Sequence, residues 1–475
     1  MSFIILILGI FVLLLVFRYP LITQWLCIYF ISNPGGVSKT YLSKEFTQFG
    51  IDYVDIFAIA IFILSLRNNK SGQFFNNKIA RQIFYTSLLL CIYRLVIYGW
   101  VLVDTNFVDY FRFFIIRERW VILGFLMIIP IYSFVLNNKL KPFIDIAILV
   151  GIILLILVLF SMLTGIEIIT IKKLYRYEGT RLYLRGYGFL FLLIPVSIIV
   201  YLSKMHLKYR KLLYIAGGLA VILIIVSITK GLYLILLGLI ATSTYCVIKI
   251  LRKRTGKLVL KIIGSGIIII VALNFLFPLY ASYTFMGFGD IFLLATEKKD
   301  SEGDNSRWWQ VEAVMYNFRQ NPILGTGESE KDLSKKFSIN QYDASDFPLI
   351  VSFMRYGILG FSIFIFILYL VIKAIKNAYL LLKHTRNSTL LTQFKYEYIL
   401  IIASIAYFGS YFFKVHSISY EFYGQTNNML FYIYVGILLG CTERLRRGVA
   451  LQKNNSYTST NNIRKDYLFG CKNIK

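Results

Sequence analysis

The sequence predicts an all-α polytopic membrane protein with twelve or thirteen transmembrane helices and one long outward loop that contains short helices. Of its 475 residues 57% are hydrophobic and only 16% are charged, and the mean hydropathy is +0.67. A soluble domain is about 45–50% apolar and about 25% charged, and one water-soluble core could not bury this much apolar surface. The composition therefore excludes an ordinary cytosolic or secreted enzyme, and it also argues against disorder.

A helix that crosses a bilayer needs about 20 apolar residues. The first two candidate runs are short and are separated only by Arg18, Tyr19 and Pro20, so they form either a tight hairpin or one span followed by a re-entrant piece. The N-terminus has no basic region and no cleavage site, and we interpret it as a retained span. The thirteen predicted spans lie near 2–17, 20–33, 52–66, 82–103, 119–136, 143–165, 186–203, 212–228, 231–250, 260–279, 347–372, 396–413 and 428–442.

These spans divide the chain into four parts. Residues 1–279 form an N-terminal transmembrane bundle, and 280–346 form the large external loop. Residues 347–447 form the C-terminal transmembrane helices, and 448–475 form a polar cytoplasmic tail that we expect to be disordered. A long loop inside a compact protein is usually functional, so the external loop is the first place to search for a site.

The charge pattern predicts the orientation. The chain carries 51 basic and 24 acidic residues, a net charge of +27, and its basic residues cluster in every second loop. Cytoplasmic loops of membrane proteins collect lysine and arginine, so these loops and the C-terminus should be cytoplasmic. We prefer this explanation to nucleic-acid binding because the clusters are separated by apolar runs. The main clusters are Lys78 and Arg81, Lys139 and Lys141, Lys204 to Lys211, Lys249 to Lys257, Lys373 to Arg386, and Arg444 to Arg447.

Several arginines occur in the loops that should face outward, where arginine is uncommon. The guanidinium group suits forked recognition of phosphate and pyrophosphate, so the set predicts a site for an anionic lipid-linked substrate. Taken singly, each arginine could instead contact lipid headgroups or snorkel to the membrane surface. The outward set comprises Arg112, Arg117, Arg119, Arg176, Arg181, Arg185, Arg307 and Arg319.

The segment from Asn305 to Gly327 is the most specific part of the external loop. Trp308 and the apolar residues up to Phe318 have helical spacing. Pro322 should end this helix, and the glycines at 325 and 327 allow a sharp turn near a ligand. The alternative is an amphipathic helix on the bilayer surface with a tryptophan anchor, and both descriptions can hold together.

Two residues at the ends of spans are further candidates. Asp346 could act as a general base on a sugar hydroxyl, or it could cap the helix that follows. Lys230, in a short outward turn, is either a phosphate ligand or an interfacial anchor. Tyr342 and Glu312 could position sugar hydroxyls. The five cysteines and three histidines are dispersed, so the sequence predicts no metal site and no cofactor.

In order and spacing these motifs resemble the O-antigen ligase and polymerase superfamily of bacteria, and its Wzy-type polysaccharide polymerases in particular. The resemblance runs along most of the chain. Ser306 and Arg307, the aromatic-apolar helix and the Pro322 to Gly327 motif match the family's loop signature, and Tyr356 to Gly360 is similar to its motif at the next span. Upstream, Thr229, Lys230 and Gly231 stand where the family often has Ser-Arg-Gly, with lysine in place of arginine, and Arg181 and Arg185 stand where it has its other outward arginine.

The resemblance implies an inverting, metal-independent glycosyltransferase on the outer face of the bacterial cytoplasmic membrane. Donor and acceptor would be glycans linked to undecaprenyl pyrophosphate, with membrane lipids and a protein that regulates chain length as further partners. Arg307 and Asp346 would be catalytic, Arg176, Arg181, Arg185 and Lys230 would bind pyrophosphate, and Tyr342, Glu312 and Trp308 would bind substrate.

The chain also departs from the family pattern. Ligases of the family have a histidine eleven residues before the glycine of the span motif, where this chain has Asp346. This difference favours a polymerase over a ligase. The arginine-to-glycine spacings along the sequence of some polymerases are not matched either. The separation from Arg307 to Gly325 has more residues than those polymerases have, and the separation from Arg319 to Gly325 has fewer. A flippase or another transporter is the more distant alternative.

Overall fold

The computed structural model describes part of the chain, and the statements below concern that part. The described residues are 58–63, 65, 71–101, 122–137, 140–164, 171–176, 179–184, 190–226, 230–251, 264, 315–316, 318–319, 321–325, 348–385, 388–410 and 427–470.

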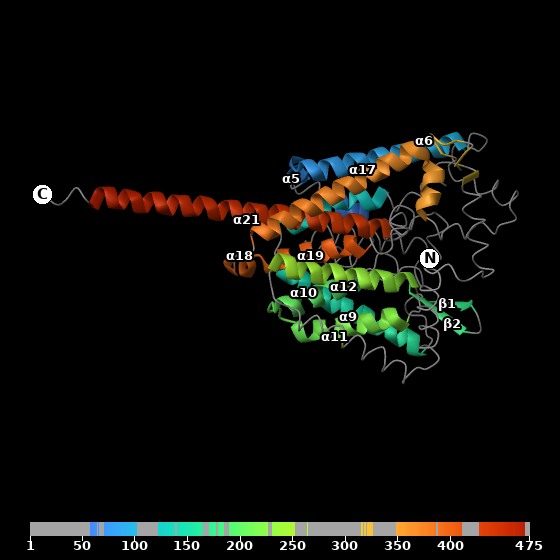
Figure 1. Ribbon diagram of the computed structural model, residues 1–475, viewed down its shortest axis with the longest axis horizontal. Coiled ribbons are helices and arrows are strands. Elements are labelled where there is room, and N and C mark those ends of the chain that lie inside the picture. The colour runs from blue at the N-terminus through green and yellow to red at the C-terminus, as the bar shows by residue number, and fades with distance from the viewer. Residues whose placement is uncertain are drawn as a thin grey trace, which may run out of the picture.

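The described residues form a bundle of helices that lie side by side along the long axis of the molecule (Figure 1). Helix is present in every predicted span between 82–103 and 231–250, and in the three predicted spans 347–372, 396–413 and 428–442. Residues 58–63 of the predicted span 52–66 are also helical. Predicted spans 2–17, 20–33 and 260–279 lie outside the described residues, apart from Gly264. The helices are α5 (Ser71–Asn76), α6 (Lys78–Val101), α8 (Ile128–Asn137), α9 (Leu140–Thr164), α10 (Leu190–Ser203), α11 (Arg210–Val226), α12 (Lys230–Leu251), α17 (Pro348–His384), α18 (Ser388–Gln393), α19 (Lys395–Ser410) and α21 (Asn427–Gly470).

Within the described part, three stretches of helix are long and apolar enough to cross a membrane. They are Lys78–Ile97, Leu140–Leu157 and Tyr356–His384. Shorter apolar helices cover Ile122–Asn137, Leu190–Ser203 and Leu234–Ile250. The described part of the chain is therefore largely helical and compatible with the membrane protein that the composition predicts.

Two helices are longer than the apolar runs that predicted them. α17 continues past residue 372 to His384, and α21 continues past residue 442 to Gly470. We expected a disordered tail over 448–475. This expectation is wrong for 448–470, because that segment is helical and projects from the bundle (Figure 1), whereas 471–475 lie outside the described residues. No proline interrupts either extension, so nothing in the backbone forces the helix to stop.

A β-hairpin stands where we expected only a loop. β1 (Ile171–Arg176) pairs antiparallel with β2 (Gly179–Leu184), with Leu174 opposite Arg181 and Arg176 opposite Gly179. Aromatic and β-branched residues in both strands and a glycine at the turn favour a hairpin. Directly paired residues lie on the same face of a sheet, so the register puts positions 176 and 181 on one face.

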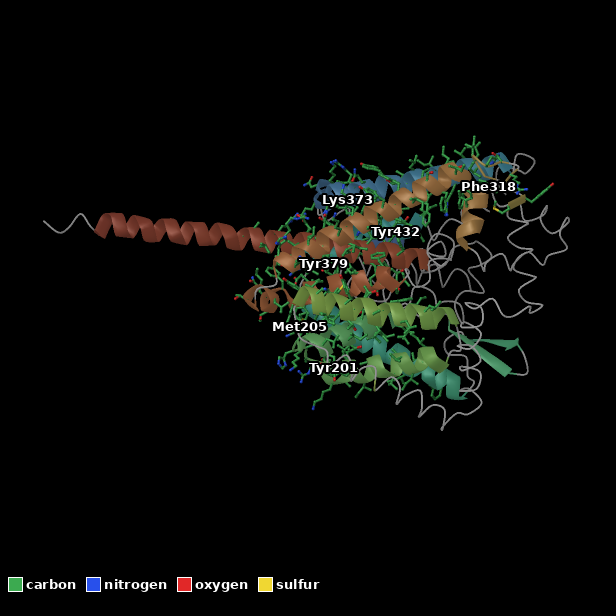
Figure 2. All side chains as sticks on the ribbon, viewed as in Figure 1. Tyr201, Met205, Phe318, Lys373, Tyr379 and Tyr432 are labelled. Atoms are coloured by element: carbon green, nitrogen blue, oxygen red, sulfur yellow. The ribbon has the colours of Figure 1, made fainter. Side chains whose placement is uncertain are left out.

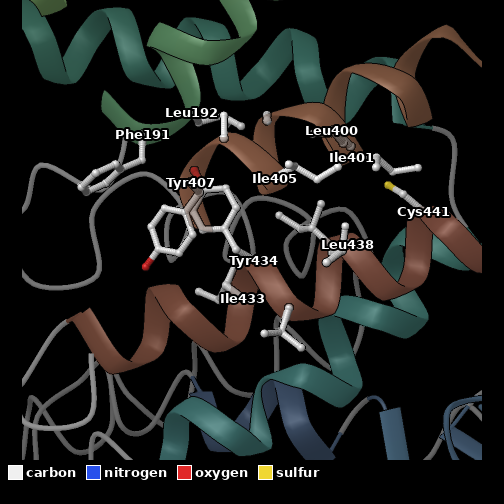
Figure 3. Close-up of a cluster of buried hydrophobic side chains, with 14 of the residues drawn as sticks. Phe191, Leu192, Leu400, Ile401, Ile405, Tyr407, Ile433, Tyr434, Leu438 and Cys441 are labelled. Atoms are coloured by element: carbon white, nitrogen blue, oxygen red, sulfur yellow. The ribbon is translucent and has the colours of Figure 1, made fainter. Parts of the chain in front are cut away.

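The core lies where α8, α10, α12, α19 and α21 pack together. The rings of Tyr407 on α19 and Tyr434 on α21 stack with centroids 4.0 Å apart (Figure 3). α21 approaches α8 closely at Gly436 and Gly440, where an added Cβ would lie 3.0 Å from Ile131 Cγ2 and from Tyr132 O respectively. Small residues four apart allow two helix backbones to come this near.

Candidate functional site

The predicted turn after Pro322 is present, and it forms the centre of the candidate site. The Gly325 N–H donates to the Asn321 carbonyl at 2.8 Å, and Gly325 has a φ of +82°. This left-handed conformation costs a glycine little and other residues more. The prediction that Gly325 allows a sharp turn is confirmed, whereas Gly327 lies outside the described residues.

The second motif forms a sharp kink in α17. Gly357 has φ +59° and ψ −170°, so two helical segments of different direction meet at this residue. A Cβ at Gly357 would collide with the Ile323 carbonyl and lie 2.5 Å from the Gly325 nitrogen. Only glycine fits at 357 without moving the turn, since the position needs both a positive φ and a close backbone approach.

The turn and the kink are joined by backbone hydrogen bonds. A helix that restarts after a kink has first N–H groups without partners in its own helix. Here the Ile358 N–H donates to the Pro322 carbonyl at 2.9 Å, and the Leu359 N–H donates to the Ile323 carbonyl at 3.2 Å. The turn therefore supplies acceptors that the restarted helix lacks, and the two motifs form one unit.

Helix α6 holds this unit from a distant part of the sequence. The Tyr93 hydroxyl lies 2.8 Å from the Leu324 carbonyl and 2.8 Å from the Tyr356 carbonyl. The buried guanidinium of Arg94 lies 4.5 Å from the centroid of the Tyr356 ring, within the range of a cation–π interaction. Sequence reasoning did not single out these two residues. For Arg94 the signal was available, since an arginine inside an apolar run is a default functional candidate.

Aromatic stacking attaches the residues before the turn to α17. The rings of Phe318 and Phe353 are stacked with centroids 4.4 Å apart, and Phe353 meets Phe361 edge-on at 5.0 Å. Phe318 lies at the end of the molecule away from the projecting part of α21 (Figure 2). Arg319, the next residue, is exposed at the same end.

The other predicted site residues fall into two groups. Arg176 and Arg181 lie on the hairpin, and Lys230 is the first residue of α12. The hairpin and the first residues of α12 lie at the same end of the bundle as the turn (Figure 1). The remaining predicted site residues, Arg185, Arg307, Trp308, Glu312, Tyr342 and Asp346, lie outside the described residues. Asp346 precedes the first residue of α17 by two positions.

Charge divides the two ends of the bundle. Exposed lysines and arginines gather at the end from which α21 projects (Figure 2). Where side chains are described, the carboxylates are Asp145, which is half-buried, and Glu397 and Glu443, which pair with arginines of α21. The opposite end carries the turn and Arg319. The exposed cations at the end from which α21 projects are Lys78, Arg81, Lys141, Lys204, Lys208, Lys211, Lys249, Lys373, Lys376, Lys383, Arg446 and Arg447.

The described residues thus define a helical bundle in which three helices are long and apolar enough to cross a membrane, with a glycine-dependent turn docked at one end. Among these residues no three His, Cys, Asp or Glu side chains are close enough to hold a metal ion. No protein-family model and no curated protein sequence matches the chain significantly.

Proposed function

We propose that the protein is a polysaccharide polymerase that acts on repeat units linked to undecaprenyl pyrophosphate at the outer face of a bacterial cytoplasmic membrane. In each cycle the growing glycan moves onto a hydroxyl of a new lipid-linked unit. The bond between the donor's anomeric carbon and pyrophosphate breaks, a glycosidic bond to the acceptor oxygen forms, and undecaprenyl pyrophosphate leaves.

The observation that carries this proposal is the docking of the Pro322 to Gly325 turn on the Gly357 kink. These two segments are the loop and span motifs on which the resemblance to the polymerases rests, and they are 32 positions apart. Two backbone hydrogen bonds and the Tyr93 hydroxyl join them. A rigid frame beside an exposed arginine suits a reaction that depends on the position of a pyrophosphate group.

The charge distribution supports the proposed orientation. Cations concentrate at the cytoplasmic ends of spans, and the described exposed cations other than Arg319 gather at the end opposite to the docked turn (Figure 2). In the proposed topology, with its twelve or thirteen spans, the turn therefore faces outward. In this proposed topology the helix that projects at the other end would extend into the cytoplasm, together with the C-terminus.

The proposed chemistry divides into two tasks. Positioned guanidinium groups stabilise the charge that develops on the leaving pyrophosphate, and we assign this task to Arg307 with Arg181, Arg185, Arg176 and Lys230. A second group must accept the proton of the attacking hydroxyl, and we assign this task to Asp346.

The remaining groups complete the proposed site. Tyr342, Glu312 and Trp308 would contact the sugars and the lipid-linked head group. Pyrophosphate is already an activated leaving group, so this scheme assigns no step to a metal ion or a nucleotide. Membrane lipids and a chain-length regulator are the further partners we propose.

The test is a gel of surface glycolipids from a strain that lacks the gene. A single repeat unit on the final acceptor, without a ladder of longer products, supports the polymerase. Finished polymer that stays on undecaprenyl pyrophosphate would instead identify a ligase, and repeat units trapped on the cytoplasmic side would identify a flippase. A ladder of normal length would reject all three functions.

A further inference from the structure

The Tyr93 hydroxyl connects the turn to the residue just before the kink. Its oxygen is 2.8 Å from the Leu324 carbonyl in the turn and 2.8 Å from the Tyr356 carbonyl just before the kink. A hydroxyl has one hydrogen to donate, so it serves the two acceptors in alternation. Loss of the hydroxyl would weaken the attachment of both segments to α6.

The surroundings of Tyr93 are shaped to hold its ring. A Cβ at Gly360 would lie 2.5 Å from Tyr93 Cε1, so glycine at 360 makes room for the ring. The neighbouring Arg94 is 2% exposed and lies over the Tyr356 ring. Two consecutive residues of α6 thus both contact Tyr356, the residue just before the kink.

Arg319 is the side chain that this arrangement presents at the outward end. It is exposed, and no other exposed cation is found among the side chains that the structure describes at this end. Its backbone is fixed on one side by the stacking of Phe318 on Phe353 and on the other by the turn that begins at Asn321.

We infer that Tyr93 is a positioning residue, which fixes the docked turn so that Arg319 can bind a pyrophosphate group. The inference rests on the proposed function for the identity of this anion. Arg319 contributes a guanidinium beyond those already assigned to the site. Tyr93 does not touch the ligand and acts through the turn.

The test uses inorganic pyrophosphate as the probe and the full-length protein in detergent. Phenylglyoxal modifies exposed arginines, and peptide mass spectrometry reports the modification of Arg319. We expect pyrophosphate to protect Arg319 in the wild type and to leave Arg446, at the opposite end, unprotected. In Tyr93→Phe the pyrophosphate concentration for half-protection should rise about two- to tenfold, the loss expected for one hydrogen bond.

Two further variants make the test specific. Tyr85→Phe removes an exposed hydroxyl from the same helix and should leave protection unchanged. Gly360→Ala pushes the Tyr93 ring away while keeping its hydroxyl, so it should weaken protection as Tyr93→Phe does. Agreement between the two variants would also separate positioning from a loss of folded protein, because unfolded molecules do not shift the half-protection concentration of the folded ones.

Two results would overturn the inference. Equal protection in wild type and Tyr93→Phe would remove the positioning role, and absence of protection in the wild type would remove Arg319 as an anion ligand. Neither result bears on the glycolipid ladder of the deletion strain, which tests the polymerase itself. A normal ladder together with clear protection would reject the polymerase and leave an anion site.

Discussion

The Nε atom of Arg444 lies 2.8 Å from Oε1 of Glu397, and this ion pair joins α21 to α19. The Glu397 side chain is 5% exposed. Nη1 of Arg444 also donates to the Val135 carbonyl on α8 at 3.1 Å. One guanidinium therefore connects three helices of the core at the end of the bundle that carries the exposed cations.

Arg444→Met should destabilise the bundle strongly. It leaves the Glu397 carboxylate buried without its partner, and removal of one member of a buried pair costs about 3–5 kcal/mol. Because 28% of the Arg444 side chain is exposed, we expect the low end of that range. The measurement is the thermal unfolding temperature of the protein in detergent.

Arg446→Met is the matched control for Arg444→Met. Arg446 lies 2.7 Å from Glu443, but 54% of its side chain is exposed. An exposed pair contributes less than about 1 kcal/mol, so this variant should unfold close to the wild-type temperature. Equal decreases in the unfolding temperature of the two variants would show that the buried Arg444–Glu397 pair stabilises the protein no more than the exposed Arg446–Glu443 pair does.

Gly357→Ala should release the turn from α17. A residue other than glycine at φ +59° and ψ −170° costs about 1–3 kcal/mol, and the added Cβ also collides with the Ile323 carbonyl. The expected result is faster trypsin cleavage after Arg319, measured by mass spectrometry of timed digests, together with shorter or absent polymer.

Gly218→Ala provides the comparison for Gly357→Ala. Gly218 lies within α11, and nothing lies within 4 Å of a Cβ added there. Since alanine favours helix over glycine by about 1 kcal/mol, this variant should be as stable as the wild type or slightly more so. If Gly357→Ala digests at the wild-type rate, the turn is held by other contacts.

The sequence indicates the helices better than it indicates the contacts between them. Apolar runs locate the spans because a bilayer imposes their length. The same rule carries no information about where a helix ends in water, so the continuation of α21 to Gly470 was missed. The hairpin was missed because its strands alternate only weakly between apolar and polar residues.

The candidate site, too, could be predicted from the sequence only in part. The glycine turn at 325 could be predicted because a proline and two glycines at this spacing have local meaning. The role of Tyr93 could not, since it depends on a contact 231 positions away along the chain. One tyrosine among 35 carries no signal of that kind.

The two ends of the bundle should lie on opposite sides of the membrane. Ile323 in the docked turn is 62% exposed, and Lys376 is exposed near the end of α17. In a cysteine-free background, Ile323→Cys should react with a membrane-impermeant maleimide added to intact spheroplasts, and Lys376→Cys only after lysis. The opposite pattern would reverse the proposed orientation, and reaction of both before lysis would reject the topology.

Arg307→Ala should abolish long polymer while the protein accumulates normally. The arginine is assigned to the leaving pyrophosphate, and loss of one such donor typically lowers turnover about 100- to 1,000-fold. Immunoblotting gives the protein level and a glycolipid gel gives the chain length. Arg81→Ala removes an exposed arginine near the first residue of α6 and should preserve the ladder. Chains of normal length in Arg307→Ala would remove this residue from the pyrophosphate site.

Asp346→Asn separates the two roles that this residue could have. Asparagine caps a helix as well as aspartate does, so the capping role of a residue just before α17 survives the change. An amide cannot accept the proton of a sugar hydroxyl, so a general base is lost, and such groups contribute about 100- to 10,000-fold. We expect polymerisation to fall sharply with an unchanged unfolding temperature.

Asp343→Asn, three positions earlier, is the control and should remain active. Near-full activity of Asp346→Asn would return the residue to capping, and the search for the base would then move to the other carboxylates of the external loop.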